Sequence, residues 1–143
     1  MGLFNKKVIS PNEQRILGPI LNNEELLSKQ IMMHLKQLLQ LIRSNRITNI
    51  EEVWHFANPL YAASFKVLRM ANEARKIENS RIAEQNFELA KRVSIDLGNL
   101  ERRVNAVSRD KANLNWIIAQ INKVLIEENN LIKIEERCKK YPI

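Results

Sequence analysis

The chain is poor in cysteine, glycine and proline, and each shortage excludes something. The one cysteine among 143 residues, Cys138, excludes an internal disulfide, and an intracellular setting is the default for such a chain. Only three glycines and four prolines occur, and runs of β-branched residues are absent, so helix explains the composition better than sheet. No apolar run approaches the length of a membrane span and no signal-peptide core follows the N-terminus, so we expect a cytoplasmic protein.

Motifs that carry catalysis or metal binding are also missing. The sequence has no phosphate loop and no dinucleotide fingerprint. His34 and His55 stand 21 residues apart and, with one cysteine, give no metal-ligand spacing. Carboxylates are scattered along charged helix faces without an identifiable polar cleft. We therefore predict a non-enzymatic protein with no cofactor, no metal and no small-molecule substrate.

Positive charge is what the chain has in excess. Its 23 lysines and arginines outnumber 16 acidic residues, giving a net charge of +7. Such a surplus favours nucleic acid, an anionic membrane or an acidic protein face as partner, against the alternative of a merely soluble basic protein. No zinc-finger, RNA-recognition or winged-helix signature is present, so nucleic-acid binding rests on charge alone.

Apolar residues recur at helical spacing over most of the chain. Steps averaging near 3.5 run through residues 60–107, with an irregular step near Asn79-Ser80, so this arm is either one very long helix or two. The predicted fold is all-α: an antiparallel helical hairpin of long helices, three to four helices in total, with a four-helix bundle as one form. Leu38 and Leu97 should be at least half buried. The helices should cover Asn23–Arg46, Glu51–Asn79, Ser80–Val107 and Asp110–Lys139.

These helices form one domain over residues 1–143. It divides into an N-terminal segment at 1–20, a hairpin core at 22–107 and a C-terminal helix at 110–140. Asn22 or Asn23 can cap the first helix, with Glu24 and Glu25 in its first turn, because the Gly18-Pro19 pair interrupts the residues before it. His34 falls on the apolar stripe of that helix, where a half-buried histidine is the expectation.

Turn and cap signals divide the rest. The hairpin should fold at Ser44–Asn49, where Thr48 and Glu51 have capping-box spacing. Asn58-Pro59 predicts a kink or a restart of the returning helix. Ser108 or Asp110 can cap the last helix.

The N-terminal segment has the character of a short amphipathic anchor. Its apolar side chains could enter the headgroup boundary while its cations meet anionic lipid; a frayed terminus is the alternative. The predicted membrane contacts are Leu3, Phe4, Lys6, Lys7 and Arg15.

Acidic and basic residues alternate along the long arm. A solvated helix of mixed charge explains them, and ion pairing between copies of the chain is the functional reading. On the second reading the self-assembly residues are Arg69, Arg75, Lys76, Glu84, Glu88, Arg92, Arg102 and Arg103.

Three features together resemble the ESCRT-III family, especially its archaeal cell-division and membrane-remodelling members. They are the opening Met1-Gly2-Leu3-Phe4 with Lys6-Lys7, the basic hairpin folded at Ser44–Asn49, and the long arm. The arm carries the sequences Arg69-Met70-Ala71-Asn72-Glu73-Ala74-Arg75-Lys76-Ile77, Phe87-Glu88-Leu89-Ala90 and Leu100-Glu101-Arg102-Arg103-Val104. The resemblance implies a coiled-coil-like scaffold that polymerises on anionic membranes and remodels them.

Two function classes stay open at this point. One is the self-assembling scaffold, a cytoplasmic protein at the membrane periphery whose partners are its own copies and an anionic membrane surface. The other is a basic helical bundle that binds nucleic acid or a nucleic-acid-handling complex, as accessory or viral structural proteins do.

Overall fold

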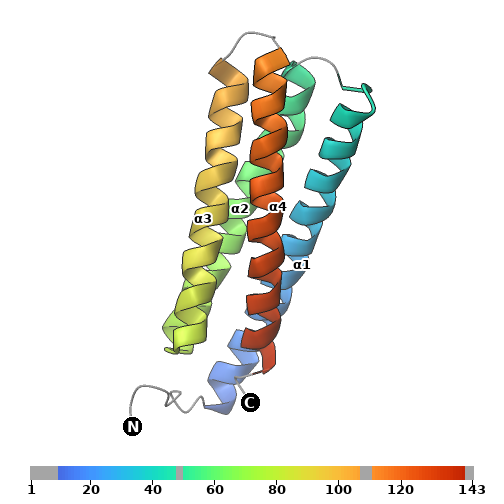
Figure 1. Ribbon diagram of the computed structural model, residues 1–143. Coiled ribbons are helices and arrows are strands. Elements are labelled where there is room, and N and C mark those ends of the chain that lie inside the picture. The colour runs from blue at the N-terminus through green and yellow to red at the C-terminus, as the bar shows by residue number, and fades with distance from the viewer. Residues whose placement is uncertain (1–9, 48–49, 107–110, 141–143) are drawn as a thin grey trace.

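A computed structural model describes residues 10–47, 50–106 and 111–140, and helices account for nearly all of them (Figure 1). The helices are α1 (Pro11–Arg43), α2 (Ile50–Ile77), α3 (Arg81–Ala106) and α4 (Lys111–Lys140). No strand occurs within these ranges. The prediction of an all-α fold is therefore confirmed, in its four-helix form.

The four helices stand around one core. Each packs against its neighbours in sequence, and α1 also packs against α4, which closes the ring (Figure 1). The long arm is two helices, because α2 ends at Ile77 and α3 begins at Arg81. The apolar stripes of this arm consequently face the other helices of the same chain.

The start of α1 differs from the prediction. Ser10 caps the helix: its Oγ accepts from the Glu13 N–H at 3.2 Å, and its own N–H donates to Glu13 Oε1 at 3.1 Å. Pro11 takes the first position, where its missing N–H costs nothing. The expected caps at Asn22 and Asn23 are therefore wrong, since both residues lie in mid-helix.

Neither internal proline ends its helix. Pro19 lies within α1 and Pro59 within α2, so neither the Gly18-Pro19 interruption nor a restart at Pro59 occurs. Each ring is on the solvent side, as are Arg15 and His55 four residues earlier, whose carbonyls lose their intrahelical partner. Water can solvate those carbonyls, so the cost of each proline is reduced.

The first turn follows the sequence signal. The chain leaves α1 at Ser44, and Asn45 has a φ of 59°, a left-handed conformation that asparagine tolerates better than most residues. The N–H groups of Arg46 and Ile47 both donate to the carbonyl of Leu41. The other predicted caps, at Thr48 and at Ser108 or Asp110, lie outside the described residues.

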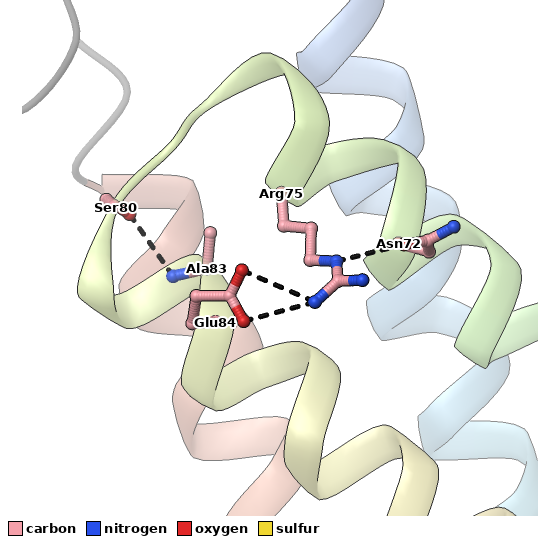
Figure 2. A network of polar contacts seen from close by, with 5 residues as sticks. All are labelled: Asn72, Arg75, Ser80, Ala83 and Glu84. Carbon is pink, nitrogen blue, oxygen red and sulfur yellow. Dashed lines mark hydrogen bonds and ion pairs between the residues drawn. The ribbon is translucent and has the colours of Figure 1, made fainter.

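A polar clasp holds the turn between α2 and α3 (Figure 2). Ser80 Oγ accepts from the Ala83 N–H at 3.2 Å and caps α3. Arg75 Nε donates to Asn72 Oδ1 at 2.9 Å, and its Nη1 reaches both carboxylate oxygens of Glu84 at 3.1 and 3.3 Å. These contacts explain why the arm folds back near Asn79-Ser80 instead of continuing as one helix.

The core is divided into two apolar clusters. The larger one includes Leu38 and Leu97, both 0% exposed, which confirms the expectation for these two residues. The smaller one, near the N-terminal end of α1, contains the buried residues Leu17, Leu21, Ala74 and Cys138. The buried polar side chains of Glu24, Ser28, Asn86 and Glu135 lie between these clusters along α1, α3 and α4.

His34, expected to be half-buried on the apolar stripe of α1, is exposed instead. Leu26 on the same helix is 58% exposed. The buried residues of α1 include two glutamates, Glu24 and Glu25, in addition to its apolar side chains.

Candidate functional site

The described charges are divided between the inside and the outside of the bundle. No lysine or arginine is among the buried residues in the described ranges. Seven acidic residues are buried: Glu24, Glu25, Glu78, Asp96, Glu127, Glu128 and Glu135. The surface is therefore more cationic than the net charge of +7 suggests, because many of the balancing carboxylates are turned inward.

This division is most complete on α1 and α4. Five of the seven buried acids belong to these two helices, which leaves Glu13 and Glu136 as the acidic residues of their described parts that reach solvent. Their exposed cations are Arg15, Lys29, Lys36, Arg43, Lys123, Lys133, Arg137 and Lys139. Most exposed acids instead lie on α2 and α3, where they alternate with bases.

Exposed apolar side chains also gather on α1 and α4. Ile16, Leu26 and Met33 on α1 are 56, 58 and 57% exposed, and Ile126 on α4 is 65% exposed. Leu26 and Met33 are seven residues apart, so they share one side of α1, and Ile126 and Lys133 share one side of α4 by the same spacing. We call the exposed surface formed by Arg15, Leu26, Lys29, Met33 and Lys36 with Ile126, Lys133 and Arg137 the α1–α4 outer face.

Beneath this face lies a cluster of carboxyl groups. Glu24 on α1 and Glu128 and Glu135 on α4 are all 0% exposed. Ser28 Oγ donates to Glu135 Oε2 at 2.6 Å, and Asn86 Nδ2 on α3 donates to Glu24 Oε1 at 2.9 Å. Both oxygens of Glu128, and one oxygen each of Glu24, Glu135 and Asn86, have no hydrogen-bond partner.

Burial without a cation disfavours the ionised form of these groups. It raises the pKa of Glu128 to about 8, and the charge of Glu24 adds to that shift. Burial also raises the pKa of Glu24 and of Glu135, whose carboxyl groups face each other. A proton held between Glu24 and Glu135 would supply the hydrogen bond that two ionised carboxylates cannot make.

At the margins of the contacts of α4 with α1 and α3, buried carboxylates pair with lysines, unlike those of the central cluster. Lys139 Nζ donates to Glu25 Oε1 at 2.7 Å, and Lys29 lies 3.2 Å from the other oxygen. Burial alone would raise the pKa of Glu25, but these two lysines outweigh it and lower the pKa. On the α3 side, Lys123 lies 3.5 Å from Asp96.

Within the described ranges, no group of three or more histidine, cysteine, aspartate or glutamate side chains is placed to hold a metal ion. Cys138 is buried beside the cluster, and burial raises the pKa of its thiol, so it is not a reactive thiolate.

A second surface feature is a shallow groove between α2 and α3. Its lining residues are Phe65, Leu68, Arg69, Asn72, Arg75 and Phe87, around a volume of about 420 Å³. The Arg75 guanidinium stacks 3.6 Å above the Phe87 ring. It also donates hydrogen bonds to Asn72 and Glu84 (Figure 2). The groove therefore offers mainly Arg69 to an anion, and its other polar contacts support the α2–α3 turn.

The predicted membrane contacts are placed only in part. Arg15 is exposed and belongs to the α1–α4 outer face. Leu3, Phe4, Lys6 and Lys7 lie outside the described residues.

The predicted self-assembly residues lie on α2 and α3. Arg75 and Glu84 pair with each other within the chain, and Arg103 lies 4.7 Å from the centre of the Trp116 ring on α4. The remaining members, Arg69, Lys76, Glu88, Arg92 and Arg102, are exposed.

The buried carboxyl groups were missed by the sequence interpretation, which placed Glu24 and Glu25 in a first helical turn. A signal was nevertheless present. Leu17, Leu21, Glu24, Ser28, Ile31 and Leu35 follow one another at steps of 4 and 3, as do Ile117, Ile121, Val124, Glu128, Leu131, Glu135 and Cys138.

Two further findings bear on function. No helix in the described ranges combines the length and the apolar character needed to cross a bilayer. Comparison of the chain with protein-family models, curated proteins and solved structures finds no match, so the ESCRT-III resemblance stays a prediction based on the residues alone.

Proposed function

We propose that the protein binds anionic membrane surfaces peripherally, through the α1–α4 outer face. The observation that carries this proposal is the inward placement of five acidic residues of α1 and α4, which leaves exposed lysines and arginines on these helices with few acidic neighbours. Each lysine or arginine near an anionic bilayer contributes roughly 1 kcal/mol of attraction. A few such residues on one face suffice for reversible binding.

The exposed apolar side chains favour a membrane over nucleic acid. Leu26, Met33 and Ile126 stand among the cations of the face. Apolar side chains gain free energy in the headgroup boundary but gain nothing from a phosphate backbone. Among the exposed cations of the α1–α4 outer face, lysine is more frequent than arginine. Lysine acts as a point charge, whereas the planar guanidinium of arginine suits base and phosphate recognition.

Polymerisation stays a prediction and receives no added support from the fold. A single long helix over residues 51–107 would carry apolar stripes that only neighbouring copies of the chain could cover. Because the arm folds back at Asn79-Ser80, the described stripes are buried within one bundle, as the 0% exposure of Leu97 illustrates. Membrane binding by single copies is therefore the core of the proposal.

Co-sedimentation with vesicles tests it. The protein should pellet with vesicles rich in phosphatidylserine, remain in the supernatant with pure phosphatidylcholine, and be released as salt rises from 0.05 to about 0.5 M, where the Debye length falls to a few ångströms. The Leu3→Asp/Phe4→Asp variant separates the N-terminal residues from the face. If the face suffices, this variant still pellets.

Two results would contradict the proposal. One is the absence of pelleting at low salt. The other is binding to duplex DNA that is tighter than binding to the anionic vesicles and falls steeply with salt, which would assign the cationic surface to nucleic acid.

A further inference from the structure

Helix α4 carries three buried carboxyl groups at its interfaces with α1 and α3. Glu127, Glu128 and Glu135 are buried on it. Glu128 and Glu135 face Glu24 of α1, and Glu127 lies beside Asp96 of α3. If these groups ionise, repulsion acts across both interfaces of α4 at once.

The groups around this cluster do not supply a buried counter-charge. Helix α1 presents Ser28 as a donor, and α3 presents Asn86. Two charged groups act on Cys138 at the end of the bundle, and their effects on its pKa are opposite in sign. They are the buried Glu78 of the α2–α3 turn, which raises the pKa, and Arg137 of α4, which lowers it.

Basic groups act only at the margins of α4. Lys139 and Lys29 are engaged by Glu25, while Lys123 and Arg92 act on the Glu127 and Asp96 pair. The cations therefore hold the edges of the interface, and its centre has none to balance ionised Glu24, Glu128 and Glu135.

The α1–α4 interface is held by side-chain contacts alone, because these two helices are not consecutive in the sequence and no turn joins them to each other. The α2–α3 turn, by contrast, is fixed by its clasp (Figure 2).

We propose that α4 is held in the bundle by protons: it stays docked while its internal carboxyl groups are neutral and separates from α1 and α3 when they ionise. Separation exposes the apolar inner surface of α4, which includes Ile121, Val124 and Leu131, and the complementary surface on α1 and α3. The α2–α3 hairpin remains folded. The bundle thus contains a device that uncovers an apolar surface as pH rises.

The sign of the pH dependence follows from linkage. The pKa of Glu128 in the folded protein is about 8, against 4.5 for an ordinary glutamate. The folded state therefore binds more protons between these two values, and stability is full below about pH 4.5 and is lost as pH rises toward 8. For Glu128 alone, linkage predicts a loss of about fiftyfold in the folding equilibrium constant between pH 6 and pH 8.

The test compares wild type with Glu128→Gln and with Glu136→Gln, a control at an exposed glutamate of the same helix. The folding equilibrium constant is measured by urea unfolding at pH 6 and at pH 8. Its decrease between these pH values should be smaller in Glu128→Gln than in wild type by a factor of about fifty. Glu136→Gln should follow wild type. Hydrogen exchange, corrected for the intrinsic rate, should show that the amides of α4 lose protection first as pH rises. The amides of the α2–α3 hairpin should stay protected.

Three outcomes would overturn the proposal. The first is an equal pH dependence of wild type and Glu128→Gln, and the second is a loss of protection that is uniform over the four helices. The third is stabilisation at pH 8 by Mn²⁺ or Ca²⁺ that Glu128→Gln abolishes, since a cation would then fill the cluster. Should Glu128→Gln fail to fold, wild type alone decides: uniform loss of protection over the four helices, or stabilisation of wild type at pH 8 by Mn²⁺ or Ca²⁺, would overturn the proposal.

Discussion

Replacing Leu38 or Leu97 by alanine should lower the free energy of unfolding by about 2–5 kcal/mol, because each removes a fully buried side chain and leaves a cavity. Both residues are 0% exposed in the larger apolar cluster, on α1 and α3. Urea or thermal unfolding monitored by circular dichroism measures the change. Such a loss is a large share of the total stability of a domain of this size.

Leu26→Ala is the matched control on α1. Leu26 is 58% exposed, so the same substitution should change the free energy of unfolding by less than about 1 kcal/mol. Equal losses at Leu26 and Leu38 would show that α1 is rotated relative to the orientation described above. Neutral outcomes at both Leu38 and Leu97 would refute the packing itself.

Reversing two charges on the α1–α4 outer face should abolish vesicle binding. In Lys36→Glu/Lys133→Glu, two attractive cations become two repelled anions. At roughly 1 kcal/mol for each unit of charge, the change amounts to about 4 kcal/mol, or nearly three orders of magnitude in the partition constant. Both side chains are exposed, so the bundle should remain folded.

The control reverses the same number of lysines on the other side of the bundle. Lys66→Glu/Lys91→Glu changes exposed residues of α2 and α3 and lowers the net charge from +7 to +3, as the first variant does. It should retain most of the binding. Equal loss in the two variants would show that net charge alone, and no particular face, governs the attraction.

The fold could be predicted from the sequence because periodic apolar residues fix the inward side of each helix. This is why Leu38 and Leu97 are where the spacing places them. The start of α1 could not be placed from the Gly18-Pro19 pair, since the cost of a proline depends on whether the freed carbonyl can reach water. The capping box of Ser10 and Glu13 was the better signal.

The candidate site was less predictable, for a physical reason. A glutamate on a helix is normally solvated, so Glu24 was placed in a first helical turn and the carboxylates in general on charged helix faces. Their burial depends on neighbours from other helices, such as Ser28 and Asn86, which no local pattern identifies. The cationic character of α1 and α4 follows from that burial and was hidden for the same reason.

The side of the bundle that meets the bilayer can be measured with spin labels on bound protein. Labels would be attached at Met33→Cys on α1 and, separately, at Ile95→Cys on α3, with the buried Cys138 replaced by alanine; the two native side chains are 57% and 52% exposed. On phosphatidylserine vesicles, the label at position 33 should become shielded from a water-soluble relaxation agent, while the label at position 95 stays accessible. Equal accessibility at the two positions, or shielding at position 95 alone, would contradict membrane binding through the α1–α4 outer face.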